Sequence, residues 1–176
     1  MSKKLIKIFI LDSGSQDAVI IALLLVLDQF TKHLAIKHLK GQPAISLIDG
    51  ILEFNYLENR GVAFGMFQNR RFMILLVGAI FISCILFIML KSPANKKCLT
   101  LHIVLSCIVA GGIGNMIDRV TFGYVVDMIS FVLIDFPIFN VADCYVVCGS
   151  IALAVVFLFV LKDEDLEFIS FKKTKE

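Results

Sequence analysis

The chain has 176 residues, of which 59% are hydrophobic and only 18% are charged, and its mean hydropathy is +0.89. A soluble domain of this length would carry far more charge, so the composition excludes that class and indicates an integral membrane protein. The formal net charge of +2 comes without a basic stripe interleaved with aromatic residues, so no nucleic-acid partner is expected. We expect residues 1–176 to form a single membrane domain.

Four segments are expected to cross the membrane, because each is long enough as a helix to span a hydrocarbon core about 30 Å thick. The first covers roughly residues 18–38 and must include charge, because its uninterrupted apolar run ends at Asp28. The second covers 72–90 and contains no charged residue. The third covers 99–117, and the fourth covers 141–161.

Basic residues predict the orientation of these spans. Lysines gather before the first span, between the second and third, and after the fourth: Lys3, Lys4, Lys7, Lys91, Lys96, Lys97, Lys162, Lys172, Lys173 and Lys175. The positive-inside rule then places both termini in the cytoplasm and 40–71 and 118–140 on the other side. Four arginines on that other side count against the orientation without reversing it: Arg60, Arg70, Arg71 and Arg119. The apolar stretch after the first lysines is too short for a cleaved signal peptide, so we expect an uncleaved leader.

In the segment 40–71 the sequence pattern changes from long apolar runs, as in the helices, to alternating apolar and polar residues, as in a strand. Asp49-Gly50 between apolar stretches predicts a β-hairpin with a two-residue turn, and Leu57 breaks the alternation that follows. Residues 59–71 hold glycines and an apolar patch, and we expect an interfacial loop or helix there, with an ordinary connection as the alternative. The expected fold class is an all-α membrane protein with four transmembrane helices and a small β element outside the membrane.

Several polar residues lie where an apolar chain normally avoids them. Asp28 and Lys32 are four residues apart, so they share a helix face, and we expect a structural ion pair. Asn115 and Asp118 share a face at the end of the third span. At the start of the fourth span, Asn140 is a suitable N-cap.

Asp127 and Asp143 are both expected near the outer membrane boundary, in apolar surroundings. Two carboxylates held together in a low dielectric share a proton, which is the state an aspartic protease requires. The sequence does not show that the two side chains meet, so a proton relay and helix packing stay open as alternatives. Asp135 is expected to be a solvated loop residue.

Five segments, in this order, resemble the motifs of the bacterial lipoprotein signal peptidases, also called signal peptidase II: "LDQFTK" (27–32), "NRGVAFG" (59–65), "GGIGNMIDR" (111–119), "VVDMI" (125–129) and "FNVAD" (139–143). That family consists of aspartic endopeptidases of the bacterial inner membrane that use no metal and no cofactor. The resemblance implies cleavage of prolipoproteins just before a lipobox cysteine that already carries a diacylglyceryl group. It also implies a periplasmic β cradle at roughly 40–71 with an interfacial helix, an active site near the periplasmic face, contact with membrane lipids, and inhibition by globomycin-type compounds.

By the same resemblance, Asp127 and Asp143 are the catalytic pair. Residues that bind substrate or support the site would be Asn59, Gly61, Asn115, Asp118, Arg119, Asn140, Ala142, Asp28 and Lys32. Asp118 is the rival for the first catalytic position, and we rank it second, as a residue that orients substrate or scaffold.

Two other functions compete with the peptidase. A small proton-coupled membrane transporter would use Asp28, Asp118, Asp127 and Asp143 as a relay, although the chain shows no internal repeat of the kind many transporters have. A non-enzymatic assembly partner would tolerate Asp→Asn changes at the proposed pair. The membrane aspartyl proteases with a GxGD motif are disfavoured because the sequence lacks that motif.

Overall fold

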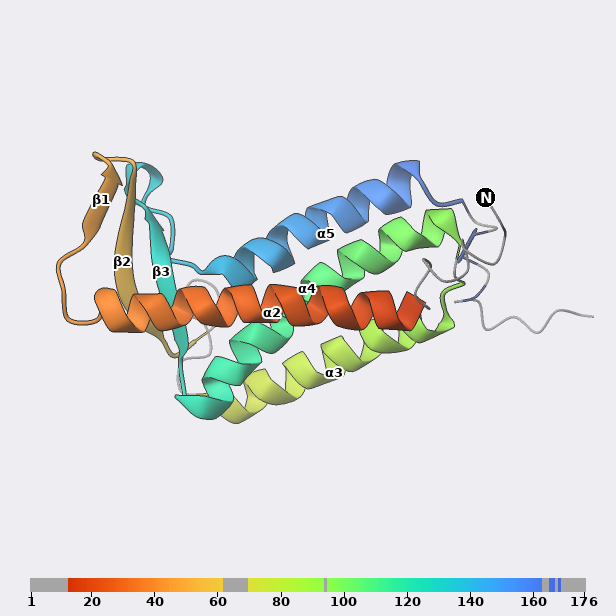
Figure 1. Cartoon of the computed structure of the whole chain (residues 1–176), viewed down its shortest axis with the longest axis horizontal. Helices are drawn as coiled ribbons and strands as arrows, with labels where there is room; N and C mark the ends of the chain where they lie inside the picture. Colours follow the sequence, from red (N-terminus) through yellow and green to blue (C-terminus); the bar gives the residue numbers. More distant parts are fainter. Residues whose placement is uncertain (1–12, 62–69, 94, 163–164, 167, 169–176) are drawn as a thin grey trace, which may run out of the picture.

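The computed structural model describes residues 13–61, 70–93, 95–162, 165–166 and 168 (Figure 1). The expected N-terminal leader and most of the expected interfacial segment at 59–71 lie outside these residues. Within them, four helices are long and apolar enough to cross a membrane, as expected. They are α2 (Ser13–His38), α3 (Arg71–Lys91), α4 (Lys96–Thr121) and α5 (Val141–Phe159).

Helix α2 begins at Ser13, earlier than the expected position near residue 18. The polar residues ahead of the apolar run join the helix because one of them has a buried partner. The Asp17 carboxylate lies 2.7 Å from His102 Nδ1 on α4, and Ser106 Oγ donates to its other oxygen at 3.5 Å. A carboxylate in an apolar bundle requires such partners, and these come from a distant segment of the chain.

Helix α4 is the centre of the bundle, because α2, α3 and α5 all pack against it. Its buried face includes Leu101, Leu105 and Val109. Gly111 brings α5 close, since a Cβ there would overlap the backbone carbonyl of Ala142. Small residues at such a contact are what allow two helices in a membrane to approach closely.

Three strands form an antiparallel sheet in the order β1 (Ile45–Ile48), β2 (Leu52–Asn59) and β3 (Val125–Phe131). The hairpin expected at Asp49-Gly50 is present, but the prediction of a two-residue turn is wrong. Ile48 pairs with Leu52, so the turn has three residues. The Ile51 N–H donates to the Ile48 carbonyl at 2.9 Å, and Gly50, the third residue of that β-turn, has a φ of +71°, which favours glycine. The break at Leu57 is an irregularity in the pairing of β2 with β3.

Strand β3 was not expected, because its sequence is an apolar run without alternation. It is buried over most of its length, since the ends of α2 and α4 pack against one side of it. The sheet lies across one end of the bundle, where α2 and α4 end and α3 and α5 begin (Figure 1). Asp127 therefore projects from a strand that is pressed against the helix ends. The following turn exposes Asp135, as expected, with a left-handed φ of 48°.

The packing at Gly111 predicts a large difference between two adjacent substitutions. Gly111→Ala should lower the free energy of unfolding by about 1–3 kcal/mol, because the methyl group meets backbone that is not free to move. Gly112→Ala is the matched control, since its methyl group would meet only the end of the Ile82 side chain. Thermal unfolding of both variants in detergent measures the difference, and equal melting temperatures would contradict the close α4/α5 contact.

Candidate active site

The sequence motifs converge where the sheet meets the helix ends. Asp127 comes from the middle of β3 and Asp143 from the first turn of α5. Asn59 is the last residue of β2, and Asn115 lies near the end of α4. The site is therefore assembled from two strands and two helices that are distant in sequence.

Asp127 is the most enclosed carboxylate on the sheet side, with 1% of its surface exposed. Asn140 Nδ2 donates to its Oδ1 at 2.7 Å, and Asn59 Nδ2 donates to its Oδ2 at 2.9 Å. Burial raises the pKa of Asp127 to about 6, and the nearby charge of Asp143 adds to the rise. The two amide donors oppose it because they stabilise the charged form, but burial prevails.

Asp143 is held at the N-terminus of α5 by a capping box with Asn140. The Asn140 backbone N–H donates to Asp143 Oδ2 at 3.1 Å, and the Asp143 backbone N–H donates to Asn140 Oδ1 at 3.0 Å. Asn115 Nδ2 donates to Asp143 Oδ1 at 2.8 Å. The expected N-cap is confirmed, and the positive end of the helix lies beside this partly exposed carboxylate.

Two asparagine side chains link the aspartates. Asn140 Nδ2, which donates to Asp127, also donates to Asn115 Oδ1 at 3.0 Å, and Asn115 in turn donates to Asp143. Each carboxylate oxygen accepts one N–H and keeps a second lone pair for a water molecule or a proton. Asp127 and Asp143 are thus neighbours in fixed orientations.

Next to this pair, Lys32 forms a buried ion triad with Asp28 and Asp118. Its Nζ lies 3.0 Å from Asp28 Oδ2 and 3.1 Å from Asp118 Oδ2, so the expected Asp28–Lys32 pair is confirmed and extended. Each carboxylate also accepts a backbone N–H: Asp28 from Ala142, and Asp118 from Val126, both at 3.0 Å. The triad therefore ties α2 and α4 to the start of α5 and to β3.

Lys32 also contacts the asparagines that link the two aspartates, because its Nζ donates to Asn115 Oδ1 at 3.0 Å. On the β2 side, Arg119 Nη2 donates to the Gly61 carbonyl at 2.6 Å, and the Gly61 N–H donates to Asn59 Oδ1 at 3.0 Å. The structure thus brings all eleven expected site residues into one hydrogen-bonded assembly.

Gln29 is the residue that sequence reasoning missed. Its Nε2 lies within hydrogen-bond distance of Asp28 Oδ2 (3.1 Å) and Asp118 Oδ1 (3.0 Å). A polar amide next to Asp28 inside an apolar span was the available signal. In the described part of the chain, no group of three or more His, Cys, Asp or Glu residues could hold a metal ion.

Comparison with known proteins agrees with this geometry. The family model described as signal peptidase (SPase) II matches residues 20–159. The chain belongs to the signal peptidase II family. Membership makes it a peptidase and does not favour the transporter.

Relatives of this signal peptidase II family member are similar over most of their length. A lipoprotein signal peptidase of Caldanaerobacter subterraneus subsp. tengcongensis is 41% identical over 142 residues, which are 80% of this chain and 94% of the relative. One from Clostridium tetani is 40% identical over 154 residues, covering 86% and 96%. A bacterial membrane enzyme solved by the in meso method at 2.3 Å resolution superposes with a TM-score of 0.71 at 25% identity, covering 92% of this chain and 95% of that one.

The buried triad makes a strong prediction about Lys32 in this family member. Lys32→Met should lower the free energy of unfolding by about 3–5 kcal/mol, because Asp28 and Asp118 would remain buried without a counter-charge. Lys37→Met, on the exposed side of the same helix, is the control and should change stability little. Melting curves of both variants in detergent test this, and a stable Lys32→Met protein would show that the triad is not needed.

Proposed function

We propose that the chain is an aspartic endopeptidase that removes signal peptides from diacylglyceryl-modified prolipoproteins, with Asp127 and Asp143 as its catalytic pair. The observation that carries the proposal is that these two carboxylates are joined through Asn140 and Asn115 but have different environments. The other nine expected residues would hold the pair and the substrate.

The environments suggest a division of roles. Asp143 is partly exposed, lies at a helix N-terminus and is oriented by two N–H donors, so water can reach it, which suits a general base. Asp127 is buried, and its pKa is raised to about 6, which suits a protonated general acid. Two carboxyl groups in different environments are typical of an acid–base pair.

Hydrolysis then follows in two proton-balanced steps. Asp143 takes a proton from water as the water oxygen bonds to the scissile carbonyl carbon, while Asp127 gives its proton to the carbonyl oxygen. In the tetrahedral intermediate, Asp143 returns its proton to the leaving nitrogen as the C–N bond breaks, and Asp127 regains a proton from a hydroxyl group. Each turnover consumes one water and restores both aspartates.

The relatives are named lipoprotein signal peptidases, and this supports prolipoproteins with a lipobox cysteine as the substrates. The acyl chains of such a cysteine stay in the bilayer, so they supply binding energy remote from the bond that is cut and help to position it. A site at the helix ends matches that depth. Globomycin-type compounds are then the expected inhibitors, and the enzyme needs no cofactor.

For location, we infer the bacterial inner membrane, with both termini cytoplasmic and the site near the periplasmic face. Lysines at the end of the bundle away from the sheet support this orientation under the positive-inside rule, including Lys91 and Lys162. The transporter is not favoured, because its four relay carboxylates all belong to the one assembly beside the sheet.

Isosteric substitutions test the catalytic pair. Asp127→Asn and Asp143→Asn should each lower turnover of a diacylglyceryl-modified prolipoprotein by at least ~10³-fold, because each removes a proton-transfer step. The measurement is cleavage by purified protein in detergent, alongside melting temperature and substrate binding.

The exposed Asp135→Asn is the matched control and should retain wild-type turnover. Asp118→Asn tests the rival assignment, in which Asp118 is catalytic. Because Asp118 contacts Lys32 and the β3 backbone, this substitution should mainly lower the melting temperature. Normal turnover in a folded Asp127→Asn or Asp143→Asn protein would remove that residue from the mechanism.

The raised pKa of Asp127 predicts an upper pH limit for activity. Below about pH 6 Asp127 holds its proton, and above that pH the protonated fraction falls, so kcat/KM should fall with it. Asn59→Ala removes a donor that stabilises the carboxylate, so the pKa of Asp127 should rise and the limit should move to higher pH. Initial rates across the acidic and neutral range measure this, with Asp135→Asn as control. A limit that moves to lower pH would contradict Asp127 as the acid.

A further inference from the structure

Outside the candidate active site, an open apolar groove of about 450 Å³ lies between α3 and α4. Ala79 and Ile82 form its α3 side, and Ile113, Met116, Ile117 and Val120 form most of its α4 side. Ser83 and Thr121 complete the lining, so no charged residue of the described chain lines it. From Ile113 to Val120 the groove follows about 10 Å of helix toward the sheet end of the bundle.

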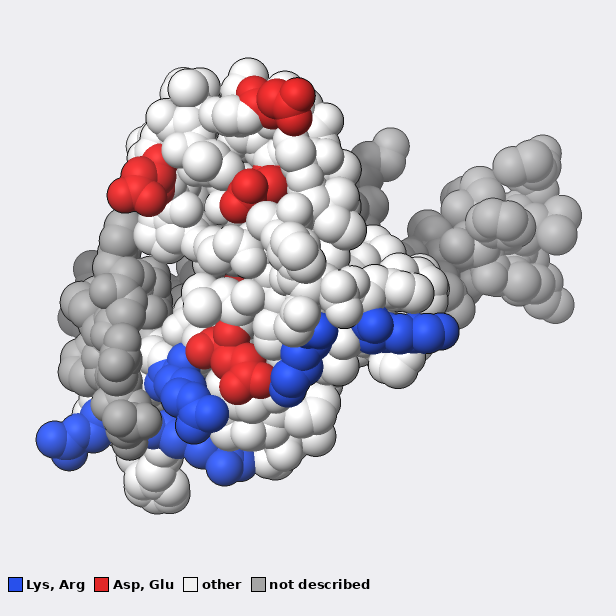
Figure 2. Space-filling view, turned by 90° about the vertical axis from the view of Figure 1, so that its left-hand side faces the viewer, with Lys and Arg blue, Asp and Glu red and all other residues white. Residues whose placement is uncertain are grey.

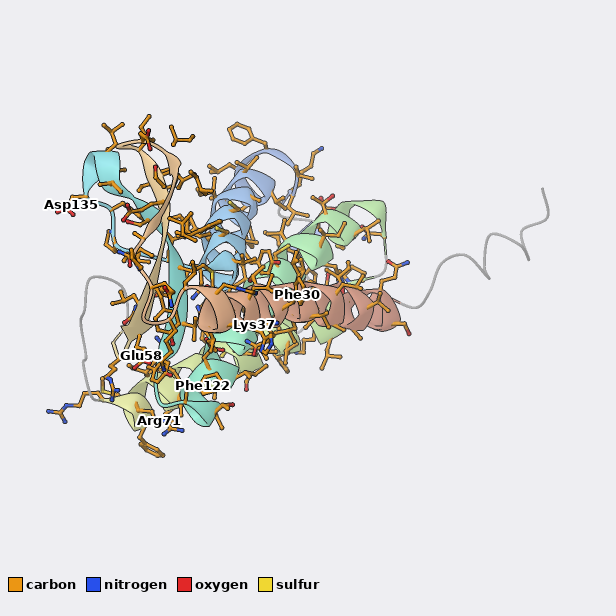
Figure 3. All side chains as sticks on the ribbon, turned by 60° about the vertical axis from the view of Figure 1, so that its left-hand side comes forward. Phe30, Lys37, Glu58, Arg71, Phe122 and Asp135 are labelled. Atoms are coloured by element: carbon orange, nitrogen blue, oxygen red, sulfur yellow. The ribbon has the colours of Figure 1, made fainter. Side chains whose placement is uncertain are left out.

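An arginine closes the sheet end of this groove. Arg71 Nη2 donates to the carbonyl oxygen of Val120 at 2.7 Å, and Val120 is a groove residue. Arg71 is exposed, as is the adjacent Arg70, and a guanidinium has five N–H donors, so several remain for another acceptor. Figure 3 shows Arg71 and the exposed Phe122 at this same end of the molecule.

Positive charge at this place is not compensated by the described chain. Viewed from the sheet end, Lys and Arg gather on one half of the molecule and most carboxylates on the other (Figure 2). Lys40 and Arg60 both pair with Glu58, at 2.8 and 3.6 Å. Among the described residues, no carboxylate forms an ion pair with Arg70 or Arg71, and the first turn of α3 has no acidic residue.

We propose that the α3/α4 groove binds one anionic phospholipid of the leaflet on the sheet side. An acyl chain lies along the apolar groove, and the phosphodiester accepts hydrogen bonds from Arg70 and Arg71. The helix ends fix the depth, because phospholipid headgroups lie where spanning helices leave the hydrocarbon. Guanidinium groups match the geometry of phosphate oxygens, and they give no comparable advantage to an uncharged diacylglyceryl group.

Such a lipid would stabilise the least supported helix. Helix α3 packs mainly against α4, and side chains over much of its length are exposed. A lipid seated between the two helices adds contacts to both, so bound lipid should raise the melting temperature. The inference does not depend on the catalytic assignment, because the groove lies on a face of α4 that supplies none of the aspartates.

The test uses the purified full chain, stripped of lipid in a neutral detergent. Dioleoyl phosphatidylglycerol, dioleoyl phosphatidylcholine and dioleoylglycerol are added separately, and native mass spectrometry and thermal unfolding report binding. The phosphatidylglycerol should be retained preferentially and should raise the melting temperature more than the other two. Equal retention of the three lipids would overturn the proposal.

Two variants locate the site. Arg70→Gln/Arg71→Gln should weaken phosphatidylglycerol binding about 30-fold, as expected for two basic residues at a membrane surface. Lys37→Gln/Lys40→Gln removes the same charge at the same end, away from the groove, and should retain binding. Ala79→Phe fills the groove without changing charge and should also abolish the preference.

Three results would contradict the assignment. If both charge variants lost phosphatidylglycerol binding equally, the lipid would be held by the overall positive charge of this end and not by Arg70 and Arg71. Dioleoylglycerol binding as well as phosphatidylglycerol would mean that the groove takes acyl chains alone. A dimer in light scattering that Ala79→Phe disrupts would mean that a second copy of the chain covers the groove.

Discussion

The structure depends on one buried cation. Lys32 contacts two carboxylates that would otherwise be buried in the bundle without a cation, and those carboxylates hold the backbone of α5 and β3. The catalytic candidates project from those same two elements. The position of each aspartate is therefore fixed through its backbone by the ion triad and through its side chain by the asparagines. A rigid support of this kind is what pairs of catalytic groups require.

The carboxylates of the site differ in solvent access and in the charge of their partners. Asp28 and Asp118 are fully buried and both contact the Lys32 ammonium, so they serve to hold the fold. Asp143 is partly open, and Asp127 lies between these extremes, buried but held only by neutral amides. Carboxylates of one chemical type thus occupy two kinds of environment, one with a cationic partner and one with neutral amide partners, and the proposed catalytic roles fall to the second kind.

The sequence predicted what local spacing determines. Four spans follow from apolar length, the Asp28–Lys32 pair follows from helical periodicity, and the Asn140 cap follows from its place before an apolar run. Strand β3 escaped prediction because burial removes the alternation that marks a strand. The start of α2 escaped because Asp17 depends on His102, a residue from another helix. The meeting of Asp127 with Asn59 and Asn140 could be expected only from family resemblance.

The polar residues of α2 also affect the cost of placing this helix in the membrane. Asp17 and Lys32 have partners on α4, and Asp28 accepts the backbone N–H of Ala142 on α5, so all three depend on segments that the ribosome makes much later. A charged residue at the centre of a lone spanning helix costs about 2.5–3.5 kcal/mol on insertion scales. The Asp28–Lys32 pair lowers this cost within α2 itself, and contacts with α4 pair the remaining groups. The first and third spans are therefore energetically coupled, because the polar groups of one are fully paired only when the other is in place.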